Sequence, residues 1–409
     1  MVRHWHADGA QQPKKQAAGG AGSDALQLIA LEQFAIRAQV RSRSLDYVSG
    51  LQAQGLAVAQ QGGETVIHLV DIGANLQSKY SRPAITRQLE RAAAAGVGTV
   101  VLTGCDLEGS LSGVQTSEWW WAQQQAPEEL EQCPQTTPAP PRPGRTRLYC
   151  TAGVHPHDAK SIARVECEGS AVCVDPAALA ELRRLAAAPW CVSLGECGLD
   201  YDRMFSPRDV QLAVFEAQAA LAAELGMPLF VHCRDRDADK GSPLGAYADL
   251  CGILKRYARA GESGGLRPER VCIHCFTGGA EELQVLWEQG FCVGVTGFLG
   301  IAKRCGATAA ALAGFPLDRL MIETDAPFMG PDKCWLPAAT GLGGRKNEPA
   351  SMPAVCRALA VALGLEPEVV AAATSANADV FFGFGRAEAA VLAHAAPAVS
   401  GTTVTTAHK

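Results

Sequence analysis

Short apolar runs alternate with longer amphipathic stretches along most of the chain, beginning at Thr65. The short runs are rich in Val, Ile, Leu and Phe and end at glycine or polar residues, which is typical of buried strands. The longer stretches repeat their apolar residues at the spacing of one helix face. The predicted strands are residues 66–73, 98–104, 148–154, 191–196, 228–233, 271–276, 291–297 and 319–325.

Eight strands that alternate with helices favour one architecture. Strands joined by helical crossovers run parallel, and eight such units close into a barrel. A doubly wound open sheet shows the same alternation and is the alternative fold. We therefore expect an α/β protein whose residues 65–385 form a (β/α)₈ TIM barrel.

Three segments lie outside this alternation. Residues 1–64 are rich in Ala, Gln and Gly, and we expect a weakly ordered or helical appendage there. A polar, Pro-rich insertion at about 115–147 interrupts the barrel between its second and third strands. Residues 386–409 are expected to form a flexible tail.

The composition is that of an ordinary globular protein, with 48% hydrophobic and 19% charged residues. No apolar run approaches the roughly 18 residues of a membrane span, so no membrane association is expected. The first residues lack the apolar core of a secretory signal. Fifteen cysteines without regular spacing indicate reduced thiols. We expect a cytoplasmic protein, and a nuclear or organellar location is compatible with the same composition.

The formal net charge of −6 changes what can be expected of a substrate. It weighs against binding of nucleic acid through a broad positive surface. A polyanionic substrate would have to be held locally, by metal ions or a few arginines. Nothing in the sequence indicates an obligate protein partner.

Side chains that can bind metal follow nearly every predicted strand. In a barrel the carboxyl ends of all strands open onto one face, where active sites are built. Any one of these residues could instead be a core histidine bonded to the backbone, or a turn cap, but their joint placement favours a shared site. They are Asp71, Asn75, His155, His157, Glu196, His232, His274, Glu323 and Asp325.

Carboxylates mixed with two or three imidazoles suit Mn²⁺, Zn²⁺, Fe²⁺ or, with water in the shell, Mg²⁺. A bridging carboxylate would allow two ions about 3.5–4 Å apart. Cys272 and Cys275 would point to opposite faces of a strand, so they are not a zinc pair. We interpret Cys197, Cys233 and Cys275 as buried packing residues beside the site. No nucleotide-binding glycine motif is present.

The strand-end motifs are "DIGANL", "TAGVHPHD", "GECGLDYDR", "PLFVHCRD", "IHCFTG", "GVTGFL", "ETDAPF" and "RKNEPA". In order and spacing they resemble the TatD family of metal-dependent deoxyribonucleases over roughly residues 67–385. The resemblance implies a barrel of the metallo-dependent hydrolase type. It also implies a nuclease that uses a divalent ion, usually Mg²⁺, with Mn²⁺ and Zn²⁺ as alternatives. Its substrate would be the 3′ end of single-stranded DNA or RNA.

The resemblance also implies roles for particular residues. Glu196 would bridge the metal ions, and His232 and His274 would bind one of them. Asp325 would be a ligand and the base for the attacking water. The remaining assignments are phosphate contacts for His155, Arg234 and Arg345, with supporting positions for Asp71, Asn75 and Glu323.

One motif departs from many members of the family, which have two histidines after the first strand. Here Gly73 and Asn75 stand at those places, so one of the two metal positions should be weaker. A second hypothesis keeps the barrel and the metal ion but changes the bond that is hydrolysed to an ester or amide. The protein would then be, for example, a deacylase that acts on aminoacyl-tRNA. A non-catalytic scaffold is disfavoured because Glu196, His232, His274 and Asp325 are all present.

Overall fold

The computed structural model describes only part of the chain. It covers residues 46–47, 49–50, 59–61, 64–66, 68–125, 145–165, 171–236, 241–258, 265–336 and 347–395.

Eight parallel strands form the central sheet, in the order in which they occur along the chain. Each predicted strand lies within a few residues of an observed one, because buried parallel strands are continuous apolar runs. The strands are β3 (Leu69–Ala74), β4 (Val97–Leu102), β5 (Arg147–Ala152), β8 (Cys191–Asp200), β9 (Leu229–Arg234), β10 (Val271–Ile273), β11 (Cys292–Val295) and β12 (Leu320–Ile322).

The sheet closes on itself just beyond the carboxyl ends of β3 and β12. The backbone N–H of Asn75 donates to Ala326 O at 2.7 Å, and that of Asp325 donates to Gly73 O at 2.8 Å. Ala74 and Ala326 form a parallel bridge at the same place. The predicted (β/α)₈ barrel is therefore confirmed, and the open doubly wound sheet is excluded.

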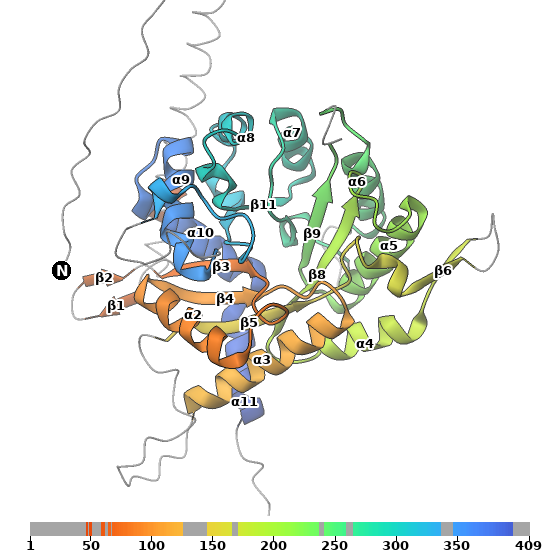
Figure 1. The fold of residues 1–409 in the computed structure, drawn as a ribbon, viewed down its shortest axis with the longest axis horizontal. Helices are drawn as coiled ribbons and strands as arrows, with labels where there is room; N and C mark the ends of the chain where they lie inside the picture. The colour runs from red at the N-terminus through yellow and green to blue at the C-terminus, as the bar shows by residue number, and fades with distance from the viewer. Residues whose placement is uncertain are drawn as a thin grey trace, which may run out of the picture.

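Helices surround the strands in sequence order (Figure 1). Helix α4 shows why they form: Asp175 caps it by accepting from Ala177 N at 2.8 Å, Pro176 begins it, and its apolar face is buried. The helices are α2 (Arg82–Ala94), α3 (Leu107–Gln125), α4 (Pro176–Ala186), α5 (Arg208–Leu225), α6 (Ala246–Tyr257), α7 (Ala280–Gln289), α8 (Gly306–Leu312), α9 (Met352–Leu363), α10 (Pro367–Phe382) and α11 (Phe384–Ala395).

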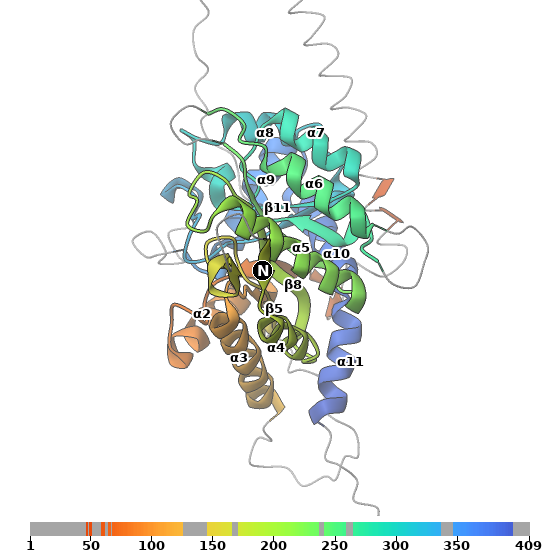
Figure 2. The same ribbon diagram turned by 90° about the vertical axis from the view of Figure 1, so that its right-hand side faces the viewer.

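The last helix, α11, packs near the amino ends of the strands, away from the strand ends that carry the polar residues. The ring of Phe384 stacks on Tyr149 of β5 at 5.0 Å between centroids. Arg147 and Glu388 form an ion pair at 3.3 Å beside it. In Figure 2 the far end of α11 projects below the other helices. The opposite face of the barrel is left for the site.

Two short hairpins and several 3₁₀ turns complete the described residues. The hairpins pair β1 (Ala59–Gln61) with β2 (Glu64–Val66) and β6 (Ala163–Val165) with β7 (Val172–Val174). The 3₁₀ turns are Ala159–Ser161, Pro268–Arg270, Gly297–Gly300, Leu317–Arg319, Lys333–Trp335 and Pro349–Ser351.

The structure modifies two of the expected segment boundaries. Residues 115–125, assigned from sequence to the insertion, continue α3, whose buried Trp120 and Trp121 bond to the backbone of Thr146 and Leu148. Residues 386–395, assigned to the tail, belong to α11. Most of the N-terminal appendage, the core of the insertion and the last residues lie outside the described residues. The division into these segments stays a prediction.

Candidate metal centre and active site

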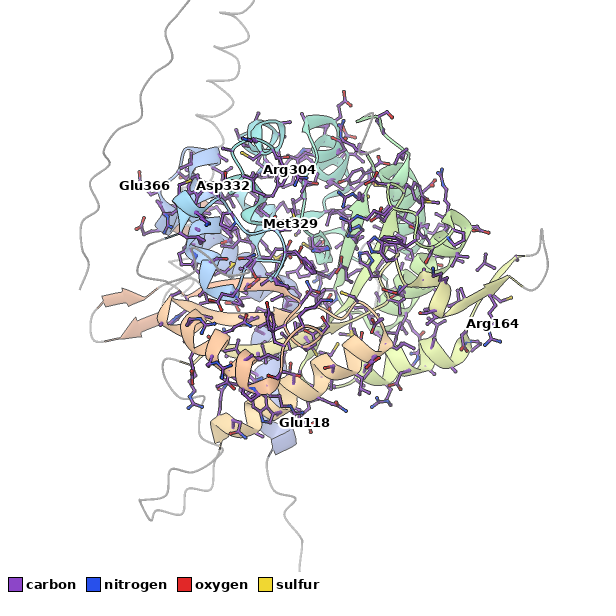
Figure 3. The ribbon with its side chains drawn as sticks, viewed as in Figure 1. Glu118, Arg164, Arg304, Met329, Asp332 and Glu366 are labelled. Carbon is purple, nitrogen blue, oxygen red and sulfur yellow. The ribbon has the colours of Figure 1, made fainter. Side chains whose placement is uncertain are left out.

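A pocket of about 500 Å³ opens at the carboxyl ends of the strands. Most of the residues singled out from the sequence line it, because every strand ends on this face. Figure 3 shows two residues of its rim, with Met329 nearer the middle of the molecule than Arg304. The lining residues are Asn75, Cys105, His155, His157, Asp158, Glu196, Arg203, His232, Cys233, Arg234, His274, Cys275, Thr277, Arg304, Asp325, Phe328 and Met329.

The Glu196 carboxylate lies at the centre of the polar residues. Its Oε1 atom is 2.6 Å from His274 Nε2, 3.2 Å from His155 Nε2 and 3.2 Å from His232 Nδ1. Burial alone would raise the pKa of this carboxyl, but the surrounding imidazoles outweigh burial and hold the pKa well below its ordinary value. Glu196 is therefore an anion on which three imidazoles converge.

The nitrogen of each imidazole that points away from Glu196 has its own partner, and this partner determines whether the nitrogen that faces Glu196 can bind a metal ion. His232 Nε2 faces Asp200 Oδ2 at 3.3 Å, and His274 Nδ1 faces Glu323 Oε2 at 3.4 Å. With a carboxylate beside the far nitrogen, the near nitrogen can donate its proton to Glu196, and it offers a lone pair to a metal ion once that proton leaves. This arrangement of carboxylate, histidine and metal is the usual one for ligating imidazoles. His232 Nδ1 and His274 Nε2 are therefore suited to bind a metal ion.

His155 has the reverse arrangement. Its Nδ1 accepts the backbone N–H of His157 at 3.0 Å, so the proton of the neutral ring sits on Nε2, the nitrogen that faces Glu196. Burial lowers the pKa of His155 to about 4, which keeps the ring neutral. The ligand atoms of His155, Glu196 and His232 lie within 4.8 Å of one another. Proximity alone would make His155 a ligand, but its tautomer makes it a hydrogen-bond donor.

The donor set fits a divalent cation. Burial lowers the pKa of His232 and of His274, but the carboxylates beside each ring outweigh it and raise both. The same negative groups that attract these protons would attract a metal ion in their place. Glu323 Oε2 and His274 Nδ1 are buried without a well-aligned hydrogen bond, although they face each other. Glu196, His232 and His274 would hold the ion.

Asp325 lines the same pocket as His232 and His274. Asn75 Nδ2 donates to Asp325 Oδ1 at 2.9 Å. The Cys105 thiol lies between the two halves of the site, 3.3 Å from Asn75 Oδ1 and 3.5 Å from Glu196 Oε2. Burial, with the charges of Glu196 and Glu323 added, raises the pKa of Asp325 to about 8 in spite of His274.

The glycine in the first motif is explained by Glu323. A Cβ atom at Gly73 would lie 2.4 Å from Glu323 Oε2, so the carboxylate takes the space of a side chain at position 73. Glu323 also accepts the backbone N–H of Cys275 at 2.5 Å. The carboxylate of Glu323, which follows β12, thus occupies the space beside Gly73 and faces His274 Nδ1 at 3.4 Å.

Asp71 is not part of the pocket lining. It is fully buried and accepts from Thr324 N at 2.8 Å and from Thr324 Oγ1 at 2.5 Å. Burial raises its pKa to about 7, and Glu323 adds to the shift while the bonds from Thr324 oppose it. Asp71 therefore fixes the segment between Glu323 and Asp325 and supports the site from below.

Three arginines line the pocket. Arg234, expected from the sequence, has its Nε 3.0 Å from Asp202 Oδ2. Arg203 and Arg304 are the other two. Arg345, the remaining expected phosphate contact, lies outside the described residues.

The interpretation of the cysteines needs a correction. Cys197 is fully buried, as expected. Cys233 and Cys275 are instead partly exposed and line the pocket, because each lies at or beyond the end of its strand, where the backbone turns toward the barrel mouth. At Cys275 the backbone has left the strand altogether, with φ at 49°.

Sequence reasoning missed several members of the site. Asp200 was not singled out, although it follows Glu196 by four residues on β8 and so faces the same side of the strand, a signal that alternation provides. Burial raises its pKa, but bonds from His157 at 2.8 Å and from His232 outweigh burial and lower it below the ordinary value. Cys105 and Arg304 had no signal, because neither belongs to a recognisable pattern.

The barrel and its site together define a class: a (β/α)₈ hydrolase whose carboxylates and imidazoles surround a place for a divalent metal ion. The family follows from comparison with known proteins. The family described as TatD related DNase matches residues 70–383, and the chain belongs to it. The resemblance seen in the motifs is confirmed, and the protein is a nuclease-type hydrolase.

Individual relatives also belong to the TatD family. A 3′-5′ ssDNA/RNA exonuclease TatD of Citrobacter rodentium is 35% identical over 316 residues, which make up 77% of this chain and 98% of that protein. The protein of the same name from Klebsiella pneumoniae is 33% identical over 316 residues, with the same coverage of both chains.

Solved structures show the same fold. A TatD family hydrolase from Entamoeba histolytica has a TM-score of 0.56 and 22% identity, over 77% of this chain and 98% of that chain. A TatD homologue from Escherichia coli has a TM-score of 0.57 and 20% identity, with the same coverage. The family and the donor set together imply a divalent metal. No helix in the described ranges is both long and apolar enough to cross a membrane.

Proposed function

We propose that the protein is an exonuclease that removes nucleotides from the 3′ end of single-stranded DNA or RNA. Two relatives named for that activity match nearly their whole length to this chain. The observation that carries the proposal is the sorting of the imidazoles around Glu196. His232 and His274 have a carboxylate beside the second nitrogen, so the nitrogen that faces Glu196 can exchange its proton for a cation. His155 instead keeps an N–H on the nitrogen that faces Glu196, because its other nitrogen accepts a backbone N–H.

In this proposal Glu196, His232 and His274 hold the ion, and Asp325 completes the ligands. A bound divalent ion would lower the pKa of a water and polarise the phosphoryl oxygens. We propose Mg²⁺ as the ion. Imidazole nitrogens suit Mn²⁺ and Zn²⁺ better, so those ions should bind more tightly in a direct comparison. Because Gly73 and Asn75 offer no imidazole, we expect a metal titration to show one tight event, with any second one weak.

The protein's own groups then handle protons and charge. Asp325 Oδ1 accepts from the Asn75 amide, and Oδ2, which lies 3.9 Å from Cys275 Sγ, would accept a proton from the attacking water. His155 Nε2–H would donate to a phosphate oxygen of the substrate. Arg234, together with Arg345, would neutralise a further phosphate charge. All of the groups named for these steps belong to this chain.

The thiols support the expected compartment. The cysteines in the described part of the chain are all unpaired, including Cys105, Cys233 and Cys275 at the pocket. Free thiols persist where the environment is reducing. We propose the cytoplasm as the place where the protein acts.

The test is metal-dependent cleavage of single strands labelled at the 3′ or the 5′ end. We expect the 3′ label to be released first, and Glu196→Gln to lose activity by more than about 100-fold, the upper range for changes around metal ligands. Circular dichroism checks that the variant folds. Glu224→Gln serves as the matched control, because Glu224 is an exposed partner of Arg183.

Two results would contradict the proposal. One is full activity with normal metal content in Glu196→Gln. The other is faster hydrolysis of an aminoacyl-tRNA ester than of single strands by the same metal-loaded preparation, which would favour the deacylase.

A further inference from the structure

The mouth of the pocket carries exposed aromatic rings that the proposed chemistry does not use. Among the phenylalanine and tryptophan side chains that the structure describes, only Phe205, Trp287 and Phe328 are strongly exposed. Phe328 is 51% exposed and lines the pocket. Phe205 is 57% exposed, and its ring meets the edge of the His157 ring at 4.7 Å between centroids. Two of the three rings are therefore at the site.

The two rings lie on opposite sides of the opening. Phe205 follows β8 and Phe328 follows β12, which are the fourth and the eighth strands of the closed sheet. In a ring of eight strands these two positions face each other across the mouth. Glu196 and the imidazoles lie between them, so a chain that crosses the opening from one ring to the other passes over the site.

Both rings stand on backbone that is tied to site residues. The Phe328 N–H donates to Asp325 O at 2.8 Å, and Asn347 Nδ2 donates to Phe328 O at 2.6 Å. On the other side Ser206, the residue after Phe205, donates through Oγ to His157 O at 2.9 Å, and Lys160 Nζ donates to Phe205 O at 2.9 Å. An exposed ring on a fixed backbone loses little conformational freedom when a flat ligand covers it.

The surroundings indicate what that ligand is. Arg203 and Arg304 line the same pocket and provide positive charge for phosphates. Lys79 Nζ lies 6.0 Å from the centre of the Phe328 ring. Flat rings beside cations are the combination that binds single-stranded nucleic acid, because every base has a face that stacks. A base in a duplex already stacks and pairs, and it would have to leave its partner first.

We infer that Phe328 and Phe205 are two nucleobase-stacking positions, one on each side of the scissile phosphate, and that they select unpaired ends. The inference rests on the proposed exonuclease activity and deepens it. Each ring takes one base without reading its edges, so recognition tolerates any sequence. The metal centre lies between the two stacked bases.

Removal of a base provides the first test. We compare a short single strand with the same strand made abasic at the terminal or at the penultimate nucleotide. Phe328→Ala should raise KM for the intact strand about tenfold, the lower range for loss of one stacked base, with a smaller change in kcat. The loss should disappear when the base that stacks on Phe328 is absent. Phe205→Ala should show the same behaviour at the other nucleotide.

Further variants separate stacking from support of the structure. Phe328→Tyr keeps the aromatic face and should retain wild-type KM, whereas Phe328→Leu keeps an apolar side chain and should not. Trp287→Ala is the matched control, because Trp287 is exposed on α7 and packs on Phe315. An equal loss on intact and abasic strands, or full activity in Phe328→Leu, would overturn the inference.

A binding measurement distinguishes failure of the inference from failure of the proposed function. Strands that carry 2-aminopurine at either nucleotide are bound to Glu196→Gln, alone and combined with Phe328→Ala or Phe205→Ala, and fluorescence quenching reports stacking. Quenching that depends on the ring, in a protein that cleaves no single strands, would refute the exonuclease and keep the stacking positions. If the protein cleaves from the 3′ end but quenching is the same with and without each ring, the stacking positions alone are refuted.

Discussion

At the scale of single residues, the three imidazoles around Glu196 differ only in what holds their second nitrogen. His232 and His274 each face a carboxylate there, whereas His155 faces a backbone N–H. We propose that the group beside the second nitrogen decides whether the side chain acts as a metal ligand or as a hydrogen-bond donor. Asp200 is the carboxylate behind His232, and it also accepts from His157 at 2.8 Å.

Substitution of Asp200 tests this directly. Asp200→Asn replaces the charged acceptor by an amide, so the proton on His232 Nε2 is held less firmly and Nδ1 is no longer fixed as the nitrogen that binds the metal. We expect metal affinity or activity to fall about 10–100-fold. Isothermal titration with Mn²⁺ measures the affinity, and the exposed Asp318→Asn is the matched control. Unchanged metal affinity would show that Asp200 does not orient His232.

Asp71 should make the stability of the protein depend on pH. Burial raises its pKa from the ordinary 3.8 to about 7, so the folded state binds this proton more tightly than the unfolded chain. Stability from this group is present at low pH and is lost as the pH rises from about 4 to about 7. Relative to Asp71→Asn, the wild type should lose up to about 1.4 kcal/mol per pH unit in that window.

Urea unfolding of both proteins across the same pH range gives the difference in free energy. Other titrating groups cancel in that difference because both proteins share them. The exposed Asp318→Asn should show no such change relative to the wild type. Parallel curves for the wild type and Asp71→Asn would contradict the expectation.

At the scale of secondary structure, β8 is the element that assembles the site. It carries Glu196 and Asp200 on one side and pairs with β9, which carries His232. Gly198 lies between the two carboxylates with φ at 140°, and a Cβ atom there would lie 1.9 Å from His232 O. The close approach of the two strands therefore requires glycine at this position.

Gly198→Ala should push β8 away from β9. The strained φ and the collision together should lower the free energy of unfolding by at least about 2 kcal/mol. Gly252→Ala is the contrasting variant, since Gly252 lies in α6 with nothing near its Cβ position, and it should gain about 0.5–1 kcal/mol. Urea unfolding measures both. Equal stability of the two variants would exclude the proposed close approach.

At the scale of the whole molecule, an acidic protein acts on a polyanion. The net charge of −6 cannot draw nucleic acid in over a distance, so contacts should be confined to the pocket mouth. The cations that the structure places there are Arg203, Arg234 and Arg304. Such a small positive area favours a short footprint and therefore the end of a strand.

The salt dependence of binding measures the footprint. Two to four neutralised phosphates give a slope of about −1.4 to −2.8 in log affinity against log salt, at about −0.7 per phosphate for single strands. Anisotropy titrations over a range of KCl concentrations provide it. A slope that implies eight or more phosphates, or efficient cutting of closed circular single strands, would contradict end-directed cleavage.

The sequence by itself determined the barrel and the side of it on which the chemistry lies. Apolar periodicity is a local property, so it located each of the eight barrel strands within a few residues, and with them the polar residues at the strand ends. Glu196, His232 and His274 could be expected together because parallel strands end on one face. The motifs at the strand ends are also local in sequence, so they could indicate the family without knowledge of the tertiary structure.

Only the tertiary structure decided what each nitrogen and carboxylate does. Asp71 precedes the first strand end but bonds to Thr324 below the pocket, and Glu323 fills the space beside Gly73. Cys105 reaches Glu196 from a loop without any pattern, and Phe205 and Phe328 face each other only because the sheet closes. These roles depend on contacts between residues far apart in the chain, which no local pattern encodes.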